Sequence, residues 1–167
     1  MAETTTAENT QYVTLGVADE RFAVPVERVR EILQLQPVAR MPNAPPHFLG
    51  MIDVRGQGVP VVDLRQKLGL GECRDSENTR IIVLQVVVDG RDIVLGLKTD
   101  RVFEVTVLDG GQLEPPPQID ARWRSDCIAG IGRRNGAFVT VFDLNRLFGM
   151  SEVALTGASG EAGQQAA

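Results

Sequence analysis

Apolar residues along this chain come in short runs separated by polar or glycine-containing turns, which is the pattern of β-hairpins. Two such runs between residues 11 and 26 flank the acidic pair at 19–20. A longer stretch, 81–97, is divided by Asp89-Gly90, and these two residue types tolerate the positive φ of a type I′ turn. Both segments are therefore predicted to form antiparallel hairpins.

Two further hairpins are predicted from glycine-containing turns. Asn135-Gly136 separates "AGIGRR" from "AFVTVF", and the residues "GQG" at 56–58 separate two apolar runs in the first half of the chain. Four hairpins within about 140 residues indicate a mostly β, antiparallel protein.

Helices are expected only at two short amphipathic segments, 63–69 and 143–149. Each begins with an aspartate in the position of an N-cap and ends at a glycine in the position that follows a helix C-terminus. The two aspartates also raise the alternative of an aspartic-protease dyad, which takes one carboxylate from each of two related halves. The cap interpretation of Asp63 and Asp143 is favoured, because a carboxylate at a helix N-terminus accepts backbone N–H bonds.

The chain repeats itself at an offset of 80 residues. Six identities share this register: Gly50, Gly56, Val61, Asp63, Leu64 and Gly69 recur as Gly130, Gly136, Val141, Asp143, Leu144 and Gly149. Upstream, "RVREI" at 28–32 resembles "RVFEV" at 101–105 with an offset of 73, and the loop 109–120 absorbs the difference, 80 − 73 = 7. The repeat predicts two similar small β-barrels packed side by side, which share apolar surface because each half alone has a marginal core.

Composition places the chain among globular proteins, with 43% hydrophobic and 23% charged residues. Residues 1–10 and 152–167 are polar and aperiodic, and we expect them to be disordered tails around a single folded domain at 11–151. No apolar run approaches the ~18–20 residues of a membrane span, and the N-terminus lacks the pattern of a signal peptide. We therefore expect no direct membrane insertion and a cytoplasmic location.

Candidate chemistry is sparse in this sequence. A net charge of −5 argues against nucleic acid as a partner, since nucleic-acid binding normally needs a basic face. Cys73 and Cys127 lack metal-site spacing and are predicted to be free thiols. His47, the single histidine, is expected to be a solvated or locally hydrogen-bonded loop residue rather than a general base. Neither enzymatic activity nor a cofactor is indicated.

The most informative feature is a pair of opposite charges in the first half. Period-two alternation in "RVREIL" places Glu31 on one face with Val29, and a half-buried carboxylate is costly unless it is paired. Arg55 is the candidate partner, because a guanidinium binds a carboxylate in bidentate fashion; the alternative is two solvated charges that contribute little. Glu104 matches Glu31, but Asn135 stands in the position of Arg55. The pair is therefore predicted to be specific to the first half, as a site on one of two similar scaffolds would be.

Four strings, "FAVPVERVREI", "GMIDVRGQGVPVVDLRQKL", "VLGLKTDRVFEV" and "VFDLNRLF", together resemble the CheW family of bacterial chemotaxis coupling proteins. The similarity covers residues 11–151, and the string from Gly50 to Leu64 is its most specific part. It implies two related, intertwined SH3-like five-stranded β-barrels packed together with short helices, without catalytic activity or cofactor. It also implies a cytoplasmic adaptor, monomeric when free, that bridges the signalling tip of a chemoreceptor (a methyl-accepting chemotaxis protein) and the regulatory domain of the histidine kinase CheA in membrane-associated arrays.

The resemblance also assigns residues. Val29, Glu31, Gly50 and Arg55 match family positions around the groove that receives the receptor's helical hairpin, and Ile119 lies in a loop that matches a kinase-contacting region. Three positions depart from the usual apolar or neutral residues of the family: Lys98, Thr99 and Asp53. These departures leave an alternative open, a coupling paralogue of a twitching, surface-sensing or developmental pathway.

Overall fold

The computed structural model describes residues 10–71, 75–117 and 127–148. The elements in these ranges are β1 (Tyr12–Val17), β2 (Glu20–Pro25), the 3₁₀ turn η1 (Val26–Arg28), β3 (Val29–Gln34), β4 (Phe48–Val54), β5 (Gln57–Asp63), α2 (Leu64–Lys67), β6 (Arg80–Val88), β7 (Arg91–Thr99), β8 (Arg101–Thr106), the 3₁₀ turn η2 (Asp109–Gly111), β9 (Ile128–Arg134), β10 (Ala137–Phe142) and α3 (Leu144–Leu147). The protein is mostly β, as predicted. The expected tails lie outside the described residues, apart from residue 10, and no described helix is long and apolar enough to cross a membrane.

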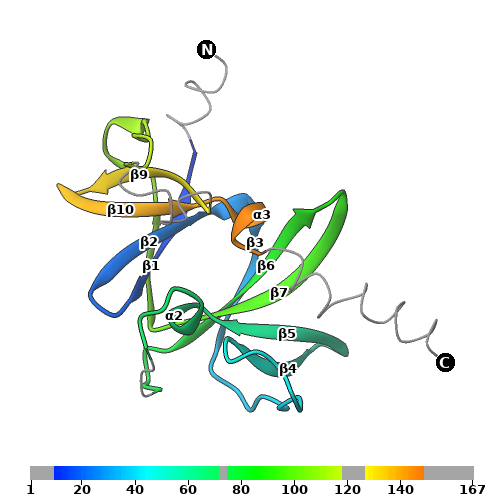
Figure 1. The fold of residues 1–167 in the computed structure, drawn as a ribbon. Helices are drawn as coiled ribbons and strands as arrows, with labels where there is room; N and C mark the ends of the chain where they lie inside the picture. Colours follow the sequence, from blue (N-terminus) through cyan, green and yellow to red (C-terminus); the bar gives the residue numbers. More distant parts are fainter. Residues whose placement is uncertain (1–9, 72–74, 118–126, 149–167) are drawn as a thin grey trace.

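The strands form two five-stranded sheets that curl into SH3-like barrels (Figure 1). Barrel A has the strand order β8-β1-β2-β10-β9, and barrel B has the order β3-β6-β7-β5-β4. The hairpin β1–β2 of the first half therefore belongs to the barrel built mainly from the second half, and the hairpin β6–β7 makes the reverse exchange. The two barrels are intertwined, as the family resemblance implies, because each contains strands from both halves of the sequence repeat.

The exchange is symmetrical. β1 pairs with β8 in barrel A as β6 pairs with β3 in barrel B, in both cases antiparallel. The parallel contact between β2 and β10 has its counterpart in the parallel contact between β7 and β5. Each barrel is closed by strands from both halves, so the two repeats can only fold together.

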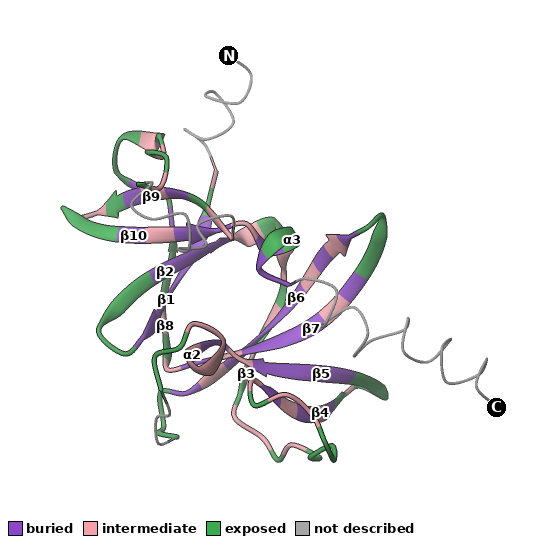
Figure 2. Ribbon diagram, in the orientation of Figure 1, coloured by how far each residue is buried: buried purple, intermediate pink, exposed green. Residues whose placement is uncertain are grey.

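A core shared by the two barrels holds the fold together. Leu15 from barrel A, Leu84 from barrel B and Phe148 after α3 are fully buried members of it. Smaller clusters fill each barrel, around Val141 in barrel A and Val59 in barrel B. Figure 2 shows the buried positions along the strands in purple, with exposed positions concentrated at hairpin ends. Separating the barrels would expose the shared core, so we expect a single cooperative unfolding transition.

Two of the four predicted turns are confirmed at their residues, with the positive φ of a type I′ turn: Asp89 (52°), Gly90 (78°), Asn135 (54°) and Gly136 (83°). The other two turns begin one residue earlier than predicted. Arg55 (51°) and Gly56 (86°) form the β4–β5 turn, and Ala18 and Asp19 form the β1–β2 turn. At β4–β5 the glycine takes the second turn position, so the residue before it must also adopt a positive φ.

Both predicted helices are present as single turns. Asp63 accepts the N–H of Arg65 at 3.0 Å before α2, and Asp143 accepts the N–H of Arg146 at 3.3 Å before α3. Gly69 follows α2 with a φ of 73°, as a residue after a helix C-terminus should, and the matching glycine after α3 lies outside the described residues. The two carboxylates are engaged as helix caps, which accounts for them without a catalytic dyad.

Candidate functional site

Glu31 and Arg55 form the ion pair that the sequence predicts. Arg55 Nη1 donates to Glu31 Oε1 at 3.1 Å and Arg55 Nη2 donates to Glu31 Oε2, so the contact is bidentate. Glu31 lies on β3 and Arg55 follows β4, and these are the two edge strands of barrel B. The pair therefore bridges the seam between the two edges of this barrel.

Arg55 reaches Glu31 from an uncommon backbone conformation. Its φ of 51° lies in the left-handed region, which costs a residue with a long side chain ~1–2 kcal/mol. Asp53 holds the turn, because its Oδ1 accepts the N–H of Gly56 at 2.7 Å. The same turn position in the second half holds Asn135, a residue type that tolerates this conformation. Arginine at this turn position therefore costs conformational energy that asparagine would not. Its presence is explained by its side chain, which binds Glu31.

The ion pair is accessible to a partner. The side chain of Arg55 is 77% exposed and that of Glu31 is 22% exposed. Both line a shallow cavity of about 190 Å³, together with Arg30 and the apolar side chains of Val83 and Val94. An exposed ion pair contributes only about 0.2–1 kcal/mol to folding. The arrangement therefore presents a charged, oriented guanidinium beside a small, mostly polar cavity that valine side chains also line.

Val29 does not share a face with Glu31, contrary to the alternation read from the sequence. Arg30 is a β-bulge, since Val29 lies opposite Leu84 while Glu31 lies opposite the adjacent residue, Val83. Adjacent residues of β6 point to opposite faces, so Val29 and Glu31 do as well. Val29 packs against the shared core, whereas Glu31 faces the cavity of barrel B.

Gly50 permits a close backbone approach within the chain. A β-carbon at this position, where φ is 145°, would lie 2.1 Å from the carbonyl oxygen of Ala39. Ala39 and Met51 exchange two backbone hydrogen bonds of 2.8 Å across this contact. Among the described residues that line the cavity of Glu31 and Arg55, Gly50 does not appear. Its structural role is to let the segment before β4 pack closely against β4 at Ala39.

The second half has an ion pair of its own, so the prediction that only the first half is paired is wrong. Arg134 Nε donates to Glu104 Oε2 at 3.1 Å and Arg134 Nη2 donates to Glu104 Oε1 at 3.4 Å. This hydrogen bonding to Glu104 raises the pKa of Arg134. The repeat alignment missed the pair because Arg134 stands one position before Asn135. Arg134 ends the regular strand β9, is only 29% exposed, and bridges the edges of barrel A as Arg55 bridges those of barrel B.

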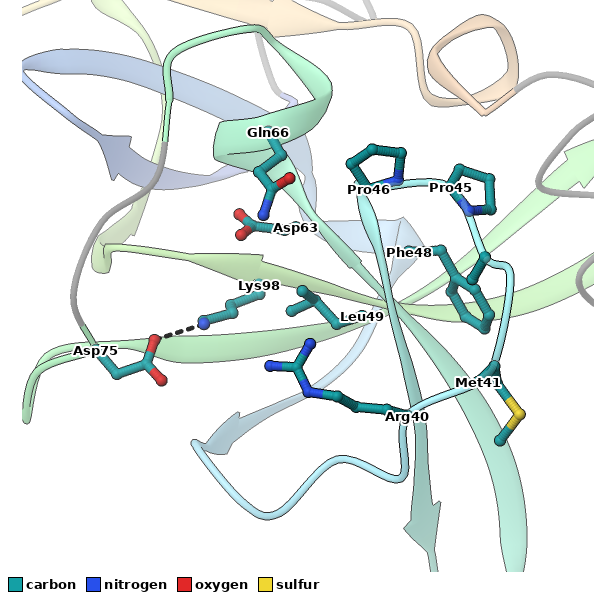
Figure 3. Close-up of a pocket in the computed structure, with 11 residues that line it drawn as sticks. Arg40, Met41, Pro45, Pro46, Phe48, Leu49, Asp63, Gln66, Asp75 and Lys98 are labelled. Atoms are coloured by element: carbon teal, nitrogen blue, oxygen red, sulfur yellow. Dashed lines mark ion pairs between the residues drawn. The ribbon is translucent and has the colours of Figure 1, made fainter.

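A second, larger cavity of about 570 Å³ lies beside α2 (Figure 3). Its described lining residues come from the segment before β4, from β4, β5, α2 and β7, and from Asp75; the predicted receptor-binding residues are not among them. Lys98, one of the departures from the family pattern, forms an ion pair with Asp75 at its wall. Thr99, another departure, is buried and donates its hydroxyl to the carbonyl of Gly16 at 2.9 Å. Both polar side chains are satisfied within the fold.

Ile119 and Cys73 lie outside the described residues. Cys127 is a half-buried thiol packed against the shared core, and His47 is half-buried ahead of β4, where its carbonyl accepts the N–H of Asp63 at 2.7 Å. Within the described ranges, no group of three or more histidine, cysteine, aspartate or glutamate side chains is arranged to hold a metal ion.

The fold and the site define a double-barrel scaffold domain, two interlocked SH3-like barrels with an oriented, accessible charge pair at one seam. The family model of the CheW-like domain matches residues 11–152. The chain therefore belongs to the CheW-like family.

Similar proteins come from several bacteria. The chemotaxis protein CheW of Rhizobium meliloti (strain 1021) is 29% identical over 142 residues, which is 85% of this chain and 89% of that protein. Protein FrzA of Myxococcus xanthus is 32% identical over 107 residues, which is 64% of each chain. The crystal structure of the scaffolding protein TtCheW from Thermoanaerobacter tengcongensis has a TM-score of 0.72 at 27% identity, covering 83% of this chain and 92% of that one.

Proposed function

We propose that this chain is a non-enzymatic adaptor that couples the cytoplasmic tip of a chemoreceptor to the regulatory domain of the histidine kinase CheA. The observation that carries the proposal is the Glu31–Arg55 pair, which places an exposed arginine in a strained turn beside a small cavity lined by polar and valine side chains. A helical hairpin offers polar and apolar side chains along one face, so it can bond the guanidinium while contacting the polar and valine side chains of that cavity. Membership of the CheW-like family supports the same role.

The four receptor-binding residues have different parts in this proposal. Arg55 contacts the receptor, and Glu31 orients Arg55 through the bidentate bond. Val29 acts indirectly, by anchoring β3 in the shared core next to the bulge. Gly50 also acts indirectly, by fixing the backbone that leads into the Arg55 turn. We also propose that the segment around Ile119, which lies outside the described residues, contacts the kinase.

Such an adaptor works by position rather than by chemistry. One face holds the receptor and another holds the kinase, and weak contacts gain strength from the high effective concentration within a membrane-associated array. Receptor state controls the kinase only if it favours one kinase arrangement over another, because a partner that binds both equally shifts nothing. The free protein is proposed to be a cytoplasmic monomer that is recruited to the array.

The second candidate is a coupling paralogue of a pathway with an output other than flagellar rotation. One relative, protein FrzA at 32% identity over 64% of this chain, carries a name other than CheW, and this supports keeping the candidate. Both candidates share the adaptor mechanism. They differ in the receptor and kinase that the protein serves.

Reconstitution of kinase control tests the adaptor role. Purified chain, a receptor signalling fragment and CheA should together give receptor-dependent kinase activity, which omission of the chain should abolish. Arg55→Glu should reduce this activity at least about tenfold, since it places like charges against Glu31 and removes the receptor contact. Arg134→Glu is the matched control, because it breaks the equivalent pair of barrel A, and it should leave most of the activity. Equal activity with and without the chain would contradict the proposal.

A further inference from the structure

A cluster on barrel A places a phenylalanine within reach of two arginines. The ring centroid of Phe103 on β8 lies 4.6 Å from Cζ of Arg21 on β2 and 5.9 Å from Cζ of Arg101. Phe103 is 39% exposed, and both arginines are exposed. These three residues, named here the Phe103 cluster, are not among the residues that line the cavity of Glu31 and Arg55 on barrel B.

Two features of the strands accommodate this cluster: a glycine on β1 and a β-bulge on β8. A β-carbon on Gly16 of β1 would lie 3.0 Å from Cε2 of Phe103 and 3.1 Å from Cγ of Arg101, so both side chains lie directly on the glycine. Glycine inside a strand is destabilising by roughly 0.5–1 kcal/mol relative to alanine, and it commonly marks a close approach. The glycine at position 16 is therefore explained by the side chains of Phe103 and Arg101, which lie directly on it.

The second feature is a β-bulge at Phe103 itself. Val102 and Glu104 lie opposite adjacent residues of β1, which leaves Phe103 as the extra residue between them. Bulges re-aim side chains and are frequent beside functional sites. The counterpart of this bulge in barrel B is Arg30, which lines the cavity of the Glu31–Arg55 site. In each barrel the bulged residue is therefore part of a surface feature. In barrel A this is the Phe103 cluster, and in barrel B it is the cavity of Glu31 and Arg55.

Charge at the Phe103 cluster is not compensated within the described chain. The described side-chain contacts of Arg21 and Arg101 are with Phe103, whereas Asp100, next to Arg101, is already bonded to Arg65 at 2.8 Å. Glu20 and Arg21 are consecutive on β2 and so project to opposite faces. Each guanidinium has five N–H donors, and two like charges beside one ring attract an anion.

We propose that the Phe103 cluster is a docking site for an acidic segment of a partner protein. Carboxylates of the segment bind Arg21 and Arg101, and a neighbouring apolar side chain of the segment covers Phe103. An inorganic anion would leave the exposed ring uncovered, while arginine with an aromatic residue is the composition of energetically dominant positions in protein interfaces. This inference does not depend on the coupling role, because it concerns different residues on the other barrel.

A nuclear magnetic resonance titration of the isotope-labelled chain tests the proposal. The probe is a peptide of alternating glutamate and leucine, with inorganic phosphate titrated separately at the same concentration. The peptide should shift the amide signals of residues 16, 21 and 101–103, and phosphate should shift them far less. Affinity for the peptide should decrease as salt is added, and the double substitution Arg21→Gln with Arg101→Gln should lower it at least about tenfold.

Arg133 provides a matched control. Its Cζ lies 4.5 Å from the ring centroid of the exposed Phe138 in the same barrel. Arg133→Gln removes one positive charge, as Arg21→Gln alone does, and should leave peptide affinity unchanged. If the double variant does not fold, Arg21→Gln alone should still lower affinity about threefold. The proposal is overturned if the peptide shifts none of these signals, if phosphate shifts them equally, which would define a small-anion site, or if Arg133→Gln weakens binding as much.

Discussion

Arg55 binds Glu31 from a turn residue with a φ of 51°, whereas the matching bond in the other barrel is made from the end of a regular strand. The first arrangement costs conformational energy and leaves the Arg55 side chain 77% exposed, and the second leaves the Arg134 side chain 29% exposed. Both pairs join the edges of a barrel, so barrel closure alone does not require the strained turn. We attribute the strained turn to the proposed presentation of the Arg55 side chain to a partner.

Replacing Arg55 with asparagine separates the conformational requirement of the turn from the contribution of the side chain to binding. Asparagine tolerates the left-handed conformation, so relief of ~1 kcal/mol of strain should offset the loss of about 0.2–1 kcal/mol from the ion pair. We expect the free energy of unfolding, measured in urea, to change by less than ~1 kcal/mol. Affinity for a receptor-tip fragment, measured by calorimetry, should fall about tenfold. Unchanged affinity would remove Arg55 from the binding site.

Charge reversal at the two glutamates compares the barrels directly. Glu31→Arg and Glu104→Arg each break one ion pair, yet only Glu31→Arg should strongly weaken binding of the receptor tip, because only that pair includes the exposed arginine. Combining Glu31→Arg with Arg55→Glu should restore part of the lost stability, with a coupling free energy of about 0.2–1 kcal/mol in a double-mutant cycle. Equal binding losses for the two glutamates would assign the receptor to both barrels or to neither.

Gly50→Ala should destabilise the fold by more than ~2 kcal/mol, because the added β-carbon would meet a backbone carbonyl at a φ that alanine rarely adopts. Gly58→Ala, on the neighbouring strand, is the control. Its β-carbon would meet only the mobile end of Met51 at 3.3 Å, and a change below ~1 kcal/mol is expected. Thermal unfolding of both variants measures the difference. Similar melting temperatures would refute the close-approach account of Gly50.

Stability should decrease at alkaline pH through Tyr12. Burial, with a smaller contribution from the charge of Glu27, raises the pKa of Tyr12 above its usual 10.0. The unfolded chain therefore loses the phenolic proton first, so stability that is complete below pH 10 declines as pH rises toward the folded-state pKa. Tyr12 is the only tyrosine, so tyrosinate absorbance reports its titration directly. Tyr12→Phe should remove this part of the alkaline loss, and an unshifted titration would contradict the burial argument.

Local elements of the fold could be predicted from the sequence, because their causes are local. Aspartate at Asp63 and Asp143 caps the helices, and Asp89-Gly90 turns its hairpin, as the residue types require. The exchange of hairpins could not be predicted from the repeat. Similar segments reveal equivalent strands, but they do not reveal which copy of a strand becomes the hydrogen-bonded neighbour.

Prediction of the site was limited by one-residue effects. The bulge at Arg30 reverses the face of Val29 relative to Glu31, since one extra residue shifts the alternation. The pair of barrel A was missed because Arg134 lies one position from the expected alignment. The Phe103 cluster was not predicted, because Arg101 and Phe103 on β8 meet Arg21 on β2 only through the exchanged hairpin β1–β2.

A titration of the labelled chain with a receptor-tip fragment, followed by the regulatory domain of CheA, tests the central claim most directly. The account predicts that the receptor fragment shifts signals of residues 26–32 and 50–56, that Arg55→Asn largely removes these shifts, and that the kinase domain shifts a different set. Receptor-induced shifts confined to barrel A, or shifts that persist at full strength in Arg55→Asn, would contradict the claim that Arg55 and Glu31 form the receptor site.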